Sequence, residues 1–217
     1  MYNSAGGEGM DKMDADRRRR DALILRIAGG DRNALAALYE GLKTPVYGVA
    51  LAILRQRSDA EDVMQSTFLR VWEHAAQYRP GTDAQAWVLT IARNLALAMV
   101  RTRKRTVPLA ESLELPAPQD DISHMIDRLL LVGLLSRLDT AEREIIILYA
   151  ACGYSHKEIA CMLGRSYATV RWKFSNAIKK LSRIVEKAED NERARIAAAA
   201  IHMLPAVHSR IKGAEVL

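Results

Sequence analysis

The sequence predicts an all-α fold of two small helical domains joined by a flexible acidic linker, with a helix-turn-helix in the second domain. Three observations support this class. Apolar residues recur at helical spacing in almost every segment, rather than in the alternation of a strand. Runs of β-branched residues are scarce. Residues 106–123 interrupt the helical pattern with three prolines and four acids, which is typical of a linker.

The linker divides the 217-residue chain into segments of different character. Residues 1–20 are glycine-rich and then charged, and we expect a disordered tail there. Residues 21–105 carry the first helical domain, and residues 124–187 carry the second. Residues 188–217 form an alanine-rich C-terminal extension.

Within the first domain, start and stop signals predict separate helices. The first, residues 21–28, stops at two glycines; a second begins near Asp31, and a third covers residues 46–54. The fourth, residues 59–76, has acids in its first turn, which suit the positive end of a helix dipole. A fifth helix covers about residues 83–103.

The composition favours an anionic partner and gives no sign of catalysis. The formal charge is +6 and the pI is about 9.4, a mild excess that favours nucleic acid or an anionic membrane surface. No apolar run approaches the roughly 18 residues of a membrane span. The five histidines show no ligand spacing, and the two cysteines, Cys152 and Cys161, fit a reducing cytoplasm. We therefore expect a cytoplasmic protein that is neither a hydrolase nor a metal enzyme.

The stretch GYSHKEIACMLGRSYATVRWKF, residues 153–174, predicts two short helices joined by a glycine turn. Ser155 and Glu158 have the spacing of a capping box. Gly164 stands where a left-handed residue ends a helix, and Ser166 caps the next helix. One face of that second helix is apolar, through Val170, Phe174, Ala177, Ile178 and Leu181. This is the pattern of a DNA-binding helix-turn-helix.

The opposite face of this second helix is placed to contact DNA, through Ala168, Arg171, Trp172, Ser175 and Lys179. Arg171 suits a guanine edge, and Trp172 suits a thymine methyl group or the sugar-phosphate backbone. Lys173, Lys179 and Lys180 suit phosphates. The alternatives are that Trp172 packs against a neighbouring helix or tail, and that the lysines form an ordinary solvated face.

The helix predicted over residues 59–76 has an unusual outward face. Its core face holds Met64, Phe68, Val71, Trp72 and Ala75. The opposite face holds Asp62, Gln65, Ser66, Leu69 and Glu73. A leucine flanked by acids and glutamine on an outward face indicates a protein-docking surface. The alternative is that another helix buries Leu69.

Several stretches, in order, resemble one known family. DAEDVMQSTFLRVW, AWVLTIARNLALAMVRTRKR and LDTAEREIIILYAACGYSHKEIACMLGRSYATVRWKFSNAIKKL resemble the extracytoplasmic-function (ECF) group of bacterial sigma factors. The upstream stretch DALILRIAGGDRNALAALYEGL fits the start of that family's first conserved domain. The resemblance covers about residues 21–183.

The resemblance implies a factor that binds core RNA polymerase, brings it to a promoter and helps to open the duplex. It also implies that the factor is not an enzyme, because the polymerase performs the chemistry, and that it uses no cofactor or small-molecule substrate. The implied polymerase contacts are the largest-subunit coiled coil and the flap. The residues that match the coiled-coil docking surface are Asp62, Gln65, Leu69 and Glu73. Ser66 stands where the family normally has an acid, but a surface ion pair is typically worth under about 1 kcal/mol, so docking need not fail.

A second implied surface recognises and melts the minus-10 element. Asn94 matches the family asparagine implicated in reading a flipped base, and the basic residues near it suit the phosphates of the strand. The full set is Arg93, Asn94, Arg101, Arg103, Lys104 and Arg105. Trp87 is expected in the helix core, and Ala98 stands where relatives often carry a polar residue.

A third implied surface, on the helix-turn-helix, reads the minus-35 element. It comprises Ser166, Ala168, Thr169, Arg171, Trp172, Lys173, Ser175 and Lys179. Trp172 replaces the small residue usual at its position, so the resemblance implies an unusual DNA address, unless an inhibitor covers Trp172 in the resting cell.

The resemblance also implies an anti-sigma factor that clamps between the two domains, and a linker that passes through the active-site cleft of the polymerase. One alternative is a stand-alone helix-turn-helix regulator whose first domain senses a ligand or a partner. Another is an adaptor that sequesters a partner without binding DNA. The abundance of lysine and arginine on the DNA-facing helices argues against an adaptor.

Overall fold

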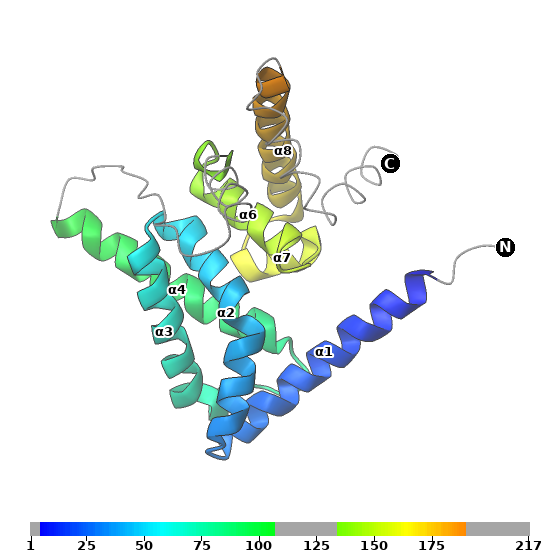
Figure 1. Ribbon diagram of the computed structural model, residues 1–217, viewed down its shortest axis with the longest axis vertical. Helices are drawn as coiled ribbons and strands as arrows, with labels where there is room; N and C mark the ends of the chain where they lie inside the picture. The colour runs from blue at the N-terminus through cyan, green and yellow to red at the C-terminus, as the bar shows by residue number, and fades with distance from the viewer. Residues whose placement is uncertain (1–4, 107–133, 190–217) are drawn as a thin grey trace. The chain divides into compact units, whose positions relative to one another are not determined.

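The computed structural model describes residues 5–106 and 134–189, and the side chains of residues 15–103 and 134–184 (Figure 1). The regular elements in these ranges are all helical, which confirms the predicted class. They are α1 (Ala5–Ala28), α2 (Arg32–Leu54), α3 (Arg57–His74), the 3₁₀ turn η1 (Ala75–Gln77), α4 (Ala84–Thr106), α6 (Thr140–Ala150), α7 (His156–Leu163) and α8 (Tyr167–Glu189).

The helices divide between two compact units, with α1 to α4 in the first and α6 to α8 in the second. The remainder of the predicted linker after Thr106, the start of the predicted second domain at residues 124–133, and the extension from residue 190 lie outside the described residues. Expectations for those segments stay predictions.

The prediction of a disordered tail was wrong for residues 5–20, which belong to α1. The glycines at the start of the chain suggested disorder, but the stretch after them is rich in charged residues and ends in four arginines, which favour a helix. The same helix then buries Ile24 and Ile27, which are 0% and 2% exposed. Tertiary burial at one end of α1 thus supports a single helix through the arginine run.

Helix α2 is continuous where two helices were expected, because it passes through Pro45. A proline inside a helix removes one backbone hydrogen bond and crowds the carbonyl four residues earlier, here that of Gly41. Leu42 and Val46, on either side of the proline, are both fully buried. Burial of both halves on one core offsets the local cost, so the proline does not end the helix.

Each helix of the first unit contributes one stripe of apolar side chains to the core. Tyr39 of α2 meets Phe68 of α3 edge to face, with ring centroids 4.8 Å apart. Arg103 of α4 forms an ion pair with Asp59 at the start of α3. The most buried side chains of the unit include Ile24, Leu38, Leu42, Val46, Val49, Val63, Val71, Val88 and Leu89.

Asp31 begins α2 and holds the preceding helix. Its Oδ1 accepts from the backbone N–H groups of Asn33 and Ala34 at 2.9 and 3.1 Å. Its Oδ2 accepts from Arg26 of α1 at 2.7 Å, a hydrogen bond that is the main cause of the lowered pKa of Asp31. Gly30, with φ of 85°, makes the left-handed turn between the two helices. The predicted stop at this turn is confirmed.

Asp83 repeats this arrangement at the start of α4. Oδ1 accepts from the backbone N–H of Ala86 at 3.0 Å, as an N-cap does. Oδ2 lies 3.4 Å from Nε of Arg17 on α1. One carboxylate therefore starts one helix and contacts another.

Asp21 of α1 organises the connection that leads into α4. The hydroxyl of Tyr78 donates to its Oδ1, and the backbone N–H of Gly81 donates to its Oδ2 at 3.3 Å. Burial and the hydrogen bond to Asp21 raise the pKa of Tyr78 to about 12. The ring of Tyr78 packs on Trp87, with centroids 5.3 Å apart. These contacts place the N-terminal turns of α4 against α1.

In the second unit, α6 begins with a reciprocal capping box. Oδ1 of Asp139 accepts from the backbone N–H of Glu142 at 2.8 Å, and Glu142 accepts from the backbone N–H of Asp139 at 2.8 Å. The expected cap, Asp139 or Thr140, is thus Asp139. The core of this unit contains Leu138, Ile146 and Ala177, with Leu135, Phe174, Ile178 and Leu181 packed against them.

We predict that Tyr78→Phe lowers the free energy of unfolding of the first unit by about 1–2 kcal/mol, because the Asp21 carboxylate loses a buried donor. The ring contact with Trp87 is kept. Urea denaturation followed by tryptophan fluorescence measures the change. Tyr39→Phe, which keeps the contact with Phe68, is the matched control and should change stability by less than about 0.5 kcal/mol. Equal stability of the two variants would contradict the role given to Asp21.

Candidate nucleic-acid and protein interfaces

Helices α7 and α8 form the predicted helix-turn-helix. Ser155 and Glu158 make the expected capping box at the start of α7. Gly164 ends α7 in the left-handed region, with φ of 61° and ψ of 38°. Oγ of Ser166 accepts from the backbone N–H of Thr169 at 3.1 Å and so caps α8. Each of these local predictions is confirmed.

The two faces of α8 separate as the apolar spacing predicts. Val170 and Ala177 are fully buried. On the outward side, Trp172 is 60% exposed and Tyr167, which the sequence analysis did not single out, is 43% exposed. The other exposed members of the predicted DNA face are Ser166, Ala168, Arg171, Ser175 and Lys179, and Thr169 is half-buried. The exposure of Trp172 argues against its packing on a neighbouring helix.

Two lysines of α8 are held by acids at the start of α6. Nζ of Lys173 donates to Oδ2 of Asp139 at 2.6 Å. Nζ of Lys180 donates to both carboxylate oxygens of Glu142, at 2.7 and 2.8 Å. Sequence reasoning missed these pairs, because their partners are 34 and 38 residues apart in the chain. The predicted phosphate contacts of both lysines compete with these ion pairs.

The environment of Asp139 keeps its carboxylate ionised. Burial alone raises the pKa, but the hydrogen bonds from Lys173 and from the backbone of Glu142, with the charges of Lys173 and Lys180, outweigh it and lower the pKa. The side chain of Glu142 is almost fully buried, at 3% exposed, beside Lys180. The N-terminus of α6 is therefore anionic, and two cations of α8 lie against it.

His156, the first residue of α7, lies in an aromatic cluster. Its ring stacks on Tyr149 with centroids 4.9 Å apart and meets Phe174 edge to face at 4.6 Å. Its Nε2 atom is buried and has no hydrogen-bond partner among the described residues. Burial, and next the charge of Arg171, lower the pKa of His156. The imidazole acts here as an uncharged core ring.

Helix α4 presents an exposed polar stripe. Asn94, Ala98 and Arg101 follow at spacings of four and three residues, so they share one face, and all three are exposed. Arg93 lies beside this stripe and is half-buried. Lys104 and Arg105 belong to the last turn of α4, and their side chains lie outside those described.

Arg103 departs from its predicted place on the DNA stripe. Its guanidinium pairs with Asp59, a residue that is 8% exposed. A buried carboxylate needs such a partner, since leaving it unpaired is costly. Arg103 therefore joins α4 to the start of α3, and no spacing in the chain would reveal this pair because its partners are far apart in the sequence.

Helix α3 exposes the predicted docking face. Asp62, Gln65, Leu69 and Glu73 are all exposed, and Leu69 is 65% exposed, so no helix of the described unit covers it. The buried side chains of the same helix are Asp59, Ala60, Val63, Thr67, Phe68 and Val71. Glu73 lies 3.6 Å from Nη1 of Arg70, an exposed pair of little energetic weight.

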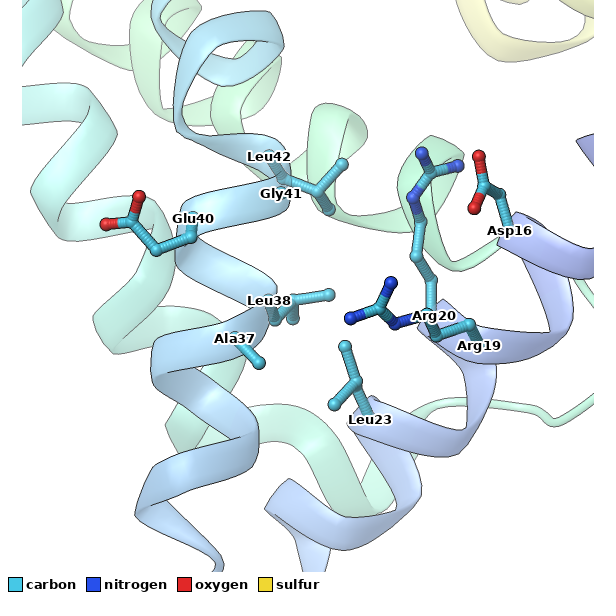
Figure 2. Close-up of a pocket in the computed structure, with 9 residues that line it drawn as sticks. All are labelled: Asp16, Arg19, Arg20, Leu23, Ala37, Leu38, Glu40, Gly41 and Leu42. Atoms are coloured by element: carbon cyan, nitrogen blue, oxygen red, sulfur yellow. The ribbon is translucent and has the colours of Figure 1, made fainter.

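A hollow of about 440 Å³ lies between α1 and α2 (Figure 2). Leu23 and Leu38 supply apolar lining, and Arg19 and Arg20 also line the hollow. Figure 2 shows one of their guanidinium groups near Leu23 and Leu38 and the other beside the carboxylate of Asp16. The lining residues include no histidine, cysteine or serine. None of the residues singled out in the sequence lines this hollow.

The described residues offer no other chemical centre. No group of histidine, cysteine and acidic side chains among them could hold a metal ion. None of the described helices has the length and hydropathy needed to cross a bilayer. Neither cysteine forms a disulfide; Cys161 is exposed, and burial raises the pKa of Cys152 to about 12.

A helix-turn-helix with an exposed basic face, in a chain whose other unit exposes an asparagine–arginine stripe and a leucine-centred face, defines a DNA-binding protein that also docks on a protein. Family models support this class in both units. The model "Sigma-70 region 2" matches residues 38–106, and the model "Sigma-70, region 4" matches residues 128–181.

Proteins with similar sequences include RNA polymerase sigma factors. The chain is 29% identical over 170 residues to the ECF RNA polymerase sigma factor SigK of Mycolicibacterium vanbaalenii, covering 74% of this chain and 86% of the relative. It is 28% identical over 178 residues to the RNA polymerase sigma factor NccH of Alcaligenes xylosoxydans xylosoxydans, covering 78% and 96%.

Solved structures show the same fold. CnrH in complex with the cytosolic domain of CnrY is similar with a TM-score of 0.59 and 25% identity, covering 78% of this chain and 98% of that chain. The sigma factor RpoE of Bartonella quintana, in complex with the anti-sigma factor NepR, has a TM-score of 0.57 at 23% identity, covering 68% and 94%. The chain belongs to the sigma-70 family of RNA polymerase sigma factors, in the ECF group, and the resemblance is confirmed. Sigma factors are transcription initiation factors and not enzymes.

We predict that the second unit loses stability as the pH falls below about 6.5, because the pKa of His156 is lower in the folded state than the usual 6.5. The neutral ring contributes stability above that pH, and this contribution is lost as the pH falls through the folded-state value. Thermal unfolding at about pH 7 and about pH 5 measures it. His156→Phe, which keeps the ring stacking, should reduce the pH dependence. An NMR pKa for His156 above 6.5 would contradict this account.

Proposed function

We propose that this sigma factor binds core RNA polymerase through the exposed face of α3 and directs initiation through DNA contacts on α4 and α8. One observation carries these assignments. The docking-face residues Asp62, Gln65 and Leu69 are exposed, while their neighbours Val63 and Phe68 are buried, so the core of the unit fixes the orientation of α3. The two sigma-70 models match the two units in the expected order.

In this proposal α4 acts on the minus-10 element. The exposed amide of Asn94 can pair with the edge of an unstacked base, and the exposed guanidinium of Arg101 lies two turns along the same face for a phosphate. Arg93 lies beside them. Lys104 and Arg105 extend the basic run to the end of α4. Arg103 contributes chiefly by joining α4 to α3.

The helix α8 acts on the minus-35 element. Its capped N-terminus and exposed first turns suit entry into the major groove. Arg171 is exposed and suited to a guanine edge, and Lys179 is exposed and suited to a phosphate. These contacts and those of α4 act on the same promoter while polymerase holds both units.

We further propose control by an anti-sigma factor, and action in the cytoplasm, where promoter DNA and polymerase meet. The support is similarity to CnrH, whose structure is a complex with the cytosolic domain of CnrY. The exposed Leu69 is a large apolar side chain that such an inhibitor would cover.

We expect Leu69→Ala to weaken binding to core polymerase by at least about tenfold, since a central exposed leucine on a docking face loses its buried contact in the complex. Leu25→Ala is the matched control, because Leu25 is also about half exposed, at 49%, but lies on α1 away from the proposed face. Fluorescence anisotropy of the labelled chain with core enzyme measures both. Equal binding by the two variants would contradict the assignment of α3.

We expect Asn94→Ala and Arg171→Ala to fail at different steps of initiation. In transcription with core polymerase on genomic fragments, Arg171→Ala should weaken promoter recruitment by about 1–3 kcal/mol. Asn94→Ala should leave recruitment nearly intact and lower open-complex formation by about tenfold, measured by permanganate reactivity of unpaired thymines. A chain that binds operators tightly without polymerase, and does not support transcription with it, would instead be a stand-alone regulator.

A further inference from the structure

We propose that Trp172 determines specificity for one thymine of the upstream promoter element by contacting its C5-methyl group, and that Asp139 positions the indole through Lys173. This inference rests on the proposed function, since it requires α8 to enter the major groove. It adds the base that is read, the chemical group that is recognised and a residue outside α8 that supports the reading.

The surroundings of Trp172 leave the indole projecting from α8. Ala168 precedes it by four residues and Ser175 follows it by three, so these short side chains are its neighbours on the same face. Both are exposed, and the indole itself is 60% exposed. Because the large ring stands between two small side chains, the indole projects beyond both of them and can enter a groove.

The chemistry of the indole selects among the groups that the major groove displays. Its ring is apolar, and its one polar atom is a donor. The thymine methyl is the apolar group on a base edge in that groove, whereas cytosine, adenine and guanine present donors and acceptors. Removing one methyl from a buried apolar contact corresponds to about a fourfold loss of affinity.

The neighbours of Trp172 favour DNA rather than protein as the occupant. A protein hot spot is normally ringed by further apolar contacts that exclude water. Among the described side chains of the second unit, the exposed large apolar residues are Tyr167 and Trp172, and Arg171 and Lys179 share the outward side of α8. Small and basic neighbours match the phosphate-lined walls of a groove.

Asp139 limits where the indole can lie. Its Oδ1 is held by the backbone of α6, and its Oδ2 accepts from Nζ of Lys173 at 2.6 Å. The same ammonium lies 5.7 Å from the centroid of the Trp172 ring, within the range of a cation–π contact. The ammonium is thus fixed between a capping carboxylate and the indole face. Lys173 is therefore a positioning residue rather than a phosphate contact.

The test begins with duplexes selected from a random library by the holoenzyme, made from core polymerase and the full chain. Each thymine of the selected upstream element is then replaced by uracil, one at a time. We expect one position at which the loss of the methyl weakens binding about fourfold for the wild type and not for Trp172→Ala. If no position shows this difference, or if Trp172→Ala changes only binding to an inhibitor, the inference is overturned.

Failure of the proposed function gives a different result, because the chain would then select no element at all. A normal selection followed by equal thymine and uracil binding overturns only the inference about Trp172. The two failures are therefore distinguishable in one experiment.

Two variants test the positioning role. Asp139→Asn keeps an equally good N-cap but removes the charge that holds Lys173. We expect this variant to bind the thymine and uracil duplexes with nearly equal affinity. Its melting temperature should stay close to that of the wild type. Glu142→Gln, which releases Lys180 instead, is the matched control and should keep the discrimination. Full discrimination in Asp139→Asn would overturn the role of Asp139.

The salt dependence of DNA affinity gives a second measurement, which changes if a lysine contacts a phosphate and not if it only positions the indole. Lys179→Ala should reduce the slope of log affinity against log salt by about 1, because a phosphate contact is lost. Lys173→Met should leave that slope unchanged. A reduction by about 1 in Lys173→Met would show that Lys173 contacts a phosphate and would overturn its positioning role.

Discussion

The aspartate that begins a helix and holds a cation of another helix is the recurring constraint in both units. In Asp31, Asp83 and Asp139 one oxygen accepts from the backbone of the first turn, and the other lies against an arginine or lysine. A cap fixes where a helix begins, and the cation fixes what lies beside that beginning. Because the same carboxylate does both, each of these three helix starts is tied to a neighbouring helix.

Burial then decides which residues each helix offers to partners. On α3 the buried Val63 and Val71 leave Leu69 outside, and on α8 the buried Val170 and Ala177 leave Trp172 outside. An exposed large apolar side chain gains free energy when a partner covers it, so each of these faces favours a contact with another molecule. A protein that alternates between a polymerase, a promoter and an inhibitor has partners for each face.

Local signals in the sequence predicted most of this fold. The capping box at Ser155, the left-handed Gly164 and the cap at Ser166 act over three or four residues, so their spacing is visible in the chain. The outward position of Trp172 followed from the apolar stripe opposite it. Short-range physics of this kind needs no knowledge of the tertiary fold.

What the sequence did not reveal depends on distant partners. Residues 31–54 were expected to form two helices, but burial on both sides of Pro45 keeps α2 continuous. Arg103, Lys173 and Lys180 all looked like phosphate ligands, and each lies against a carboxylate of another helix. A lysine or arginine that forms an internal ion pair and one that contacts DNA are the same residue type in the sequence. Only their positions in the folded structure distinguish them.

The contrast between the two cysteines has a practical consequence. Burial keeps the thiol of Cys152 protonated at neutral pH, whereas Cys161 is exposed on α7, one turn before Gly164. The chain has no other cysteine. A maleimide dye would therefore attach chiefly at Cys161, close to the turn between α7 and α8, without any engineered thiol. The fluorescence intensity of this dye, or energy transfer from it to a second fluorophore, would report in real time when DNA or an inhibitor binds near Cys161.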